Sequence, residues 1–83
     1  MTIMGVKPAE IRVDLHGCNQ FQARIRLNAA LKDTGGVYRV RVIHGFNSGN
    51  ALRDMVRNEY ASHPKVIRTD EREPGATVLI LRK

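Results

Sequence analysis

No hydrophobic run in the sequence approaches the ~18 residues that a membrane-spanning helix requires. The first residues, Met1-Thr2-Ile3-Met4, lack the basic-then-apolar pattern of a secretory signal peptide. Cys18 is the single cysteine and cannot form an internal disulfide, which fits a protein of the reducing cytoplasm. There is no low-complexity segment. We therefore expect a cytoplasmic protein that does not associate with membranes.

Acidic residues are also few. The chain has 8 aspartates and glutamates against 14 lysines and arginines, which gives a formal net charge of +6 and a pI near 10.3. Its 83 residues, 42% hydrophobic and 27% charged, are enough for one small globular domain. The basic excess favours a polyanionic partner, nucleic acid above all. The alternative is a soluble surface that is merely basic.

Hydrophobic periodicity predicts the order β-α-β-α-β-β. Residues 1–9 show no periodicity and include Pro8, so we expect a flexible N-terminal lead-in before a domain at 10–83. From Glu10, apolar and polar residues alternate as in a strand up to His16. The other predicted elements are a helix at 20–32, a strand at 37–44, a helix at 50–62, and strands at 65–69 and 76–81.

These elements predict a two-layer α/β sandwich, in which a mixed four-stranded sheet carries two helices on one face. The first two strands should be parallel and joined by a right-handed crossover, and the last two should form an antiparallel hairpin. Pro74 and Gly75 stand where a type II turn places proline and glycine. The last strand is apolar on both faces, so we expect it to be central or covered on both sides.

The first predicted helix has two apolar stripes. Its core stripe has helical spacing and consists of Ala23, Leu27, Ala30 and Leu31. A separate stripe consists of Phe21, Ile25 and Ala29. We expect this second stripe to pack beneath the following strand, with a dimer contact as the alternative.

Two strand-to-helix turns share one design, because Asp14-Leu15-His16-Gly17 and Ile43-His44-Gly45 each end a strand with histidine and glycine. Both histidines should therefore lie at the carboxyl edge of the sheet, where α/β folds usually bind ligands. Asp14 and His16 point to one side of the strand, with their Cβ atoms roughly 6–7 Å apart. A carboxylate at that distance can orient an imidazole as general acid or base. Asp14 and His16 are our candidate catalytic residues, with plain turn chemistry as the alternative.

The loop after the second histidine leads directly into a predicted helix. Free backbone N–H groups and the helix dipole favour phosphate there, and an arginine in the first turn can add a bidentate contact. The alternative is a simple turn with a helix cap at Ser48 or Asn50. The predicted phosphate-binding residues are His44, Gly45, Asn47, Ser48, Gly49 and Arg53.

The polar side of the first two strands carries further charge. Arg12 shares it with Asp14 and His16 on the first strand, and Arg39 and Arg41 extend it on the second. Buried arginine is rare unless paired, so this face should meet either solvent or a nucleic-acid backbone. His44 has the opposite parity and should point toward the helices.

Other chemistries find little support. The glycine loop lacks the Gly-Lys-Ser/Thr ending of a Walker motif and the glycine spacing of a dinucleotide fingerprint. His16, Cys18 and His44 lack the spacing of zinc sites. We therefore assign no metal ligands, and no cofactor is certain, although participation of a divalent Mg or Mn ion is left open.

Taken together, the motifs resemble the Smr (small MutS-related) domain over nearly the whole chain, from about Ile11 to Leu81. The resemblance rests on Asp14-Leu15-His16-Gly17, on Ile43-His44-Gly45 followed by Gly49 and Leu52-Arg53, on His63-Pro64, and on Pro74-Gly75-Ala76-Thr77-Val78. It implies a fold like the C-terminal domain of bacterial translation initiation factor three. It also implies nucleic-acid binding, often with endonuclease or nicking activity on DNA or RNA, and in some relatives action on stalled ribosomes.

By position, the family's Asp-x-His motif falls on Asp14 and His16, and its glycine loop on His44, Gly45 and Gly49. Asn47 takes the place of the loop's second glycine in a loop one residue longer, and Gln22 replaces a glutamate common in the family. Both departures count against cleavage more than against binding. We expect an endonuclease, and the alternatives are a non-catalytic nucleic-acid or ribosome-binding module and a protein-interaction module. The sequence does not fix the oligomeric state.

Overall fold

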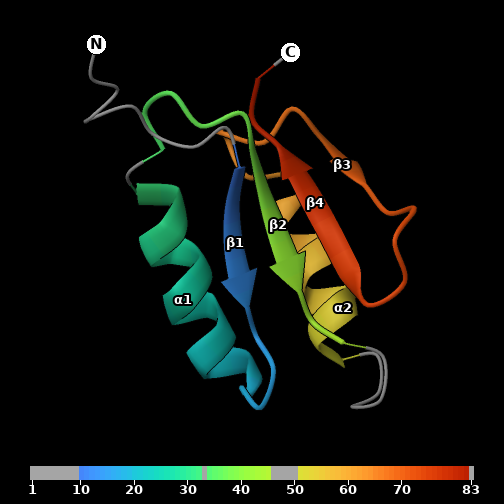
Figure 1. Cartoon of the computed structure of the whole chain (residues 1–83). Helices are drawn as coiled ribbons and strands as arrows, with labels where there is room; N and C mark the ends of the chain where they lie inside the picture. Colours follow the sequence, from blue (N-terminus) through green and yellow to red (C-terminus); the bar gives the residue numbers. More distant parts are fainter. Residues whose placement is uncertain (1–9, 33, 46–50, 83) are drawn as a thin grey trace, which may run out of the picture.

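In the computed structural model, a mixed four-stranded sheet carries two helical segments on one face (Figure 1). The structure describes residues 10–32, 34–45 and 51–82, so the predicted lead-in at 1–9 lies outside the described residues. The elements are β1 (Glu10–Asp14), α1 (Gln20–Lys32), β2 (Arg39–Ile43), α2 (Ala51–Met55), the π-helical η1 (Val56–Tyr60), β3 (Arg68–Asp70) and β4 (Ala76–Ile80). The predicted β-α-β-α-β-β order and fold class are confirmed.

The sheet has the strand order β1-β2-β4-β3. β1 and β2 are parallel, and β4 pairs antiparallel with both β2 and β3. The last strand of the chain is therefore central, as its two apolar faces predict. Gly75 has a positive φ of 79°, and the Ala76 N–H donates to the Glu73 carbonyl, which agrees with the predicted turn at Pro74-Gly75.

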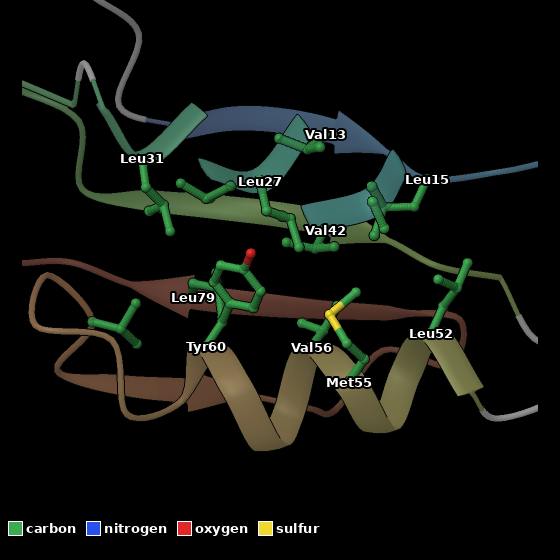
Figure 2. Close-up of a cluster of buried hydrophobic side chains, with 13 residues drawn as sticks. Val13, Leu15, Leu27, Leu31, Val42, Leu52, Met55, Val56, Tyr60 and Leu79 are labelled. Carbon is green, nitrogen blue, oxygen red and sulfur yellow. The ribbon is translucent and has the colours of Figure 1, made fainter. Parts of the chain in front are cut away.

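The core lies between the sheet and both helical segments (Figure 2). Alternate residues of β1, β2 and β4 meet Leu27 and Leu31 of α1 and Val56 and Tyr60 of the second helix. The two helices also contact each other directly. Arg24 of α1 makes a two-pronged ion pair with Glu59 of η1 at 2.9 and 2.7 Å, and Tyr60 donates to Asn28 at 2.8 Å.

The carboxyl end of α1 is capped by a side chain from a distant segment. Lys65 donates to the Leu31 carbonyl and lies 3.5 Å from the Lys32 carbonyl and 3.4 Å from the Thr34 hydroxyl. Unpaired carbonyls make the end of a helix negative, so an ammonium group stabilises it. This contact holds the segment before β3 against the end of the first helix.

Several boundaries differ from the predictions. β1 ends at Asp14 because the chain already turns at Leu15, whose carbonyl accepts from the Cys18 N–H at 2.9 Å. The third strand is shorter than predicted because the Val66 N–H bonds the His63 carbonyl within a turn, which leaves β3 only Arg68–Asp70.

The second helix ends at Tyr60 and not at Ser62, and its second half is a π-helix. The wider π-helical turn lets neighbouring Met55 and Val56 face the core together with Tyr60, five residues after Met55. Arg57 and Glu59 are placed on the flanks of this turn.

The prediction for the second stripe of α1 is wrong. Phe21 is 70% exposed and Ile25 is 55% exposed, and Ala29 is exposed as well. β1 and β2 lie over the face of α1 that carries Ala23, Leu27 and Leu31, so none of the strands in the described part of the chain covers the opposite face. The stripe therefore lies on the surface.

The two faces of α1 provide a matched stability test. Leu27→Ala should lower the free energy of unfolding by about 2–5 kcal/mol, because it leaves a cavity in the core. Ile25→Ala, on the exposed side of the same helix, should change it by no more than about 0.5 kcal/mol. Urea denaturation of both variants measures the difference, and an equal loss in the two would contradict the assignment of the faces.

Candidate functional site

Both strand-to-helix turns lie at one edge of the sheet. The parallel register pairs Asp14 with Ile43, and the Leu15 N–H extends it by donating to the Ile43 carbonyl at 2.8 Å. Continued two residues beyond the Asp14–Ile43 pair, this register brings His16 next to Gly45. The first turns of α1 and α2 begin at the same edge (Figure 1). This confirms the edge predicted from the repeated motif and makes it the candidate functional site.

The first turn presents His16 to solvent. Gly17 adopts a positive φ of 79°, which closes the turn through the Cys18 N–H and leaves His16 exposed at its tip. The Asp14 Oδ1 accepts a hydrogen bond from the backbone N–H of His16 at 2.8 Å. In this geometry the carboxylate of Asp14 holds the backbone of the turn and not the imidazole ring. This is the turn chemistry that the sequence analysis gave as the alternative.

A cavity of about 300 Å³ opens beside this turn and is called the His16 pocket below. It is lined by His16, Gly17, Cys18, Gln22, Ile25 and Arg26. The Arg26 Nη1 donates to the Asp14 carbonyl at 2.8 Å, so its guanidinium is anchored at the end of β1. Arg26 was not among the predicted site residues. Arg26 lies three residues after Ala23, on the side of α1 next to β1. The sequence alone does not show that β1 lies there, so it could not identify Arg26 as part of the site.

Gln22 has a structural function at the start of α1. Its Oε1 accepts from the Asn19 N–H at 3.1 Å, and the Asn19 Oδ1 accepts from the Gln22 N–H at 2.8 Å. This reciprocal pair is a capping box, in which glutamine and glutamate serve equally. Asn19 and Gln22 together therefore cap the start of α1.

The second histidine is buried. His44 is 2% exposed and points toward the helices, as strand parity predicts. Its Nδ1 lies 3.1 Å from the Gly45 carbonyl, which can only accept, so Nδ1 carries the proton. Nε2 then accepts from the Thr77 hydroxyl at 2.9 Å, and Thr77 accepts from the Arg57 Nε at 3.1 Å. Burial and the positive charges of Arg57 and Arg53 lower the pKa of His44, so the ring is neutral.

Arginines surround a second cavity, of about 200 Å³, next to His44; it is called the arginine pocket below. Arg53 and Arg57 come from the second helix and Arg72 from the segment between β3 and β4. Its other lining residues are His44, Gly45, Glu71, Glu73, Pro74 and Gly75. Arg53 was predicted here, whereas Asn47, Ser48 and Gly49 lie outside the described residues.

Sequence reasoning missed two of these arginines. Arg57 follows Arg53 by one helical turn, a spacing that places both on one side of a helix and could have identified it. No local pattern points to Arg72, which reaches the pocket because β4 turns back beside β2. Arg72 also holds Asp70, and their hydrogen bonds lower the pKa of Asp70 to about 2.

The open face of the sheet is less basic than predicted. Arg39 and Arg41 both bind Glu10, at 2.8 and 2.9 Å, and Arg41 also pairs with Glu73. The hydrogen bonds from Arg41 and Arg39 lower the pKa of Glu10. Arg12 is exposed, and the register places it beside Arg41. Of the arginines predicted on this face, two therefore have carboxylate partners within the domain.

The remaining predictions concern metals and membranes. Within residues 10–32, 34–45 and 51–82, no three His, Cys, Asp or Glu side chains gather as metal ligands would. In the same part of the chain, no helix is long and apolar enough to cross a bilayer.

The buried His44 predicts how stability responds to acid. Because its folded pKa lies below the unfolded value of about 6.5, the unfolded state binds more protons as the pH falls through that value. The free energy of unfolding should be constant between about pH 6.5 and 8 and fall below about pH 6.5, by at most about 1.4 kcal/mol per pH unit. Glu10, Glu59 and Asp70 also have lowered pKa values, but their contributions are lost only below about pH 4.5.

Denaturation between pH 7.5 and 5.5 measures this response. His44→Gln should flatten the slope, whereas His63→Gln, which leaves His44 in place, should keep it. The assignment would be contradicted by a slope that survives in His44→Gln.

Comparison with known proteins agrees with the geometry. A family model described as the Smr domain matches residues 13–82. The crystal structure of the Smr domain of Thermus thermophilus MutS2 superimposes with a TM-score of 0.73 and 24% identity, covering 92% of this chain and all of that one. No curated protein matches. Since the family model spans both histidine turns, the arginine pocket and every strand but the start of β1, the chain belongs to the Smr domain family.

Proposed function

We propose that this Smr domain binds nucleic acid at the carboxyl edge of β1 and β2, with a phosphate in the arginine pocket. The observation that carries the proposal is the convergence of Arg53 and Arg57, from the second helix, and Arg72, from the segment before β4, on one small cavity. Guanidinium groups bind phosphate in bidentate fashion and remain charged at any working pH. The net charge of +6 adds long-range attraction for a polyanion.

The arginines of the pocket differ in how strongly they are fixed. Arg57 is held by Thr77 at 3.1 Å and lies 3.6 Å from the Glu71 carboxylate, so its position is set before a ligand arrives. Arg53 contacts the exposed Asp54 at 3.2 Å, and the Arg72 side chain is 90% exposed beyond its pair with Asp70. Exposed ion pairs of this kind contribute little to stability. A phosphate can therefore compete for Arg53 and Arg72 at small cost, while Arg57 stays in place.

Family membership supports the same proposal, because Smr domains are nucleic-acid-binding and nuclease-like modules. Cleavage of a phosphodiester is the finer part of our proposal. His16 is the exposed group able to remove a proton from the attacking hydroxyl or water, or to donate one to the leaving oxygen. Asp14 acts through the backbone of the turn and is a positioning residue.

The binding site is tested by two double variants that each remove two positive charges. Arg53→Gln with Arg72→Gln should reduce the slope of log affinity against log salt concentration by about 1, since both side chains bind the one phosphate in the pocket and a lost phosphate contact removes about one unit. Arg39→Gln with Arg41→Gln removes the same charge from the open face of the sheet, outside the proposed interface, and should leave the slope nearly unchanged.

Fluorescence anisotropy with a labelled oligonucleotide at several salt concentrations measures both slopes. Binding that depends on Arg39 and Arg41 but not on Arg53 and Arg72 would place the interface on the open face of the sheet. Affinity that is independent of salt would defeat the proposal of nucleic-acid binding altogether.

The cleavage proposal predicts a contrast between His16 and Asp14. His16→Ala should slow cleavage about 10²–10⁴-fold with little change in binding. Asp14→Asn should retain most of the activity, because the amide oxygen can still accept from the His16 N–H, whereas Asp14→Ala should lose more. Single-turnover cleavage of a labelled substrate by nuclease-free preparations measures the rates. A His16→Ala protein that cuts as fast as the parent would remove His16 from the reaction.

A further inference from the structure

The exposed stripe of α1 (Phe21, Ile25 and Ala29) begins at the same edge as the candidate site. Phe21 lies in the first turn of the helix and is 70% exposed, which is unusual for a phenyl ring on a small domain. Ile25 lies one turn further on and is 55% exposed. The stripe is thus an exposed apolar surface that starts beside the His16 turn.

The stripe and the His16 pocket are continuous. Ile25 belongs to the stripe and also lines the pocket, together with His16, Gln22 and Arg26. The volume of about 300 Å³ is at the lower end for small-molecule sites and suits a group no larger than one nucleoside. Gln22 uses its Oε1 in the capping box, and its amino group carries two further donors. The residues that line the His16 pocket therefore include polar groups able to bind the edge of a base.

The charges around the stripe favour an anionic ligand. The segment Gln20–Lys32 contains no acidic residue, and Arg26 and Lys32 stand beside the stripe and at its end. The carboxylate of Glu59 binds Arg24 on the other flank of α1, away from the stripe. An apolar surface bordered by cations complements a nucleobase attached to a phosphate backbone.

We propose that Phe21 is a stacking platform for an unpaired base of single-stranded nucleic acid, with the adjoining nucleoside in the His16 pocket. This inference rests on the proposed function and specifies its substrate class. A base within a duplex is stacked on both faces and cannot lie on Phe21, whereas an unpaired base can. The domain should therefore prefer single-stranded segments, loops or overhangs to a continuous duplex.

A second copy of the chain is a weaker occupant for the stripe. Phe21 and Ile25 together expose on the order of 200–300 Å² of side chain, whereas a stable interface buries roughly 800 Å² on each partner. The basic groups next to the stripe would also face their own copies across a two-fold axis. One stacked base, by contrast, needs only the area of a ring.

Tryptophan fluorescence tests the inference directly, because the chain contains no tryptophan. Phe21→Trp places a single reporter on the stripe and retains a stacking surface. Tyr38→Trp is the matched control, because Tyr38 is 47% exposed and precedes β2, at the end of the sheet away from the two histidine turns. Titration with a single-stranded oligonucleotide should quench the fluorescence of the Phe21→Trp variant and leave that of the Tyr38→Trp variant nearly unchanged.

Affinity measurements complete the test. Phe21→Ala should weaken binding to the single strand by about 5- to 150-fold, the range for loss of one stacked base. Binding to a duplex of equal length should not change.

The outcomes separate this inference from the proposed function. Salt-dependent binding that is equal for single strand and duplex and unaffected by Phe21→Ala would overturn the stacking platform and leave the arginine pocket intact. Absence of salt-dependent binding to either ligand would overturn both. A Phe21→Ala protein whose sedimentation shows loss of a dimer, with unchanged affinity for nucleic acid, would overturn the stacking platform and assign the stripe to a second copy.

Discussion

The parallel pairing of β1 with β2 is the constraint on which the site depends. The register from Glu10–Arg39 to Asp14–Ile43, extended by the Leu15 N–H, brings together two turns that are nearly thirty residues apart in the sequence. A right-handed crossover through α1 is needed to make this pairing. The same crossover puts the first turn of α1, with Phe21 and the capping box, beside His16. A shift of β1 by one residue against β2 would turn His16 toward the helices and take Val13 and Leu15 out of the core.

The two histidine turns differ in the polar contacts that their histidines make, and therefore in their roles. His44 is buried, neutral and bonded to Thr77 and Gly45, so it fixes the edge and, through Thr77, the position of Arg57. His16 is exposed on a turn closed by Asp14 and Gly17. One histidine therefore belongs to the scaffold of the site and the other to its surface, although the local sequence around each is nearly the same.

Much of the fold could be predicted from local pattern. The bounds of α1, the central position of β4, the Pro74-Gly75 turn and the inward direction of His44 all follow from periodicity and turn chemistry within short segments. The π-helical turn, the short β3 and the exposure of Phe21 could not, because each is decided by packing between distant segments. Helical spacing identifies Phe21 and Ile25 as a stripe. Whether a strand packs over that stripe depends on the tertiary structure, which the spacing does not show.

The candidate site was predicted less completely, since pairing between charges is a tertiary property. Arg39 and Arg41 look free in the sequence because their partners, Glu10 and Glu73, are about thirty residues away. Conversely, Arg72 joins the arginine pocket only because the segment before β4 runs beside the carboxyl end of β2. The net positive charge of the chain can be counted from the sequence, but which part of the folded surface carries it cannot.

The central claim is that nucleic acid meets the carboxyl edge and not the open face of the sheet. Backbone amide chemical shifts, followed by NMR during titration with a single-stranded oligonucleotide, test it most directly. We predict that the largest changes fall on residues 15–26, 44–45, 51–57 and 71–75, with small changes at 10–12 and 39–41. Changes concentrated on 10–12, 39–41 and 68–70, with the two histidine turns unaffected, would contradict the account.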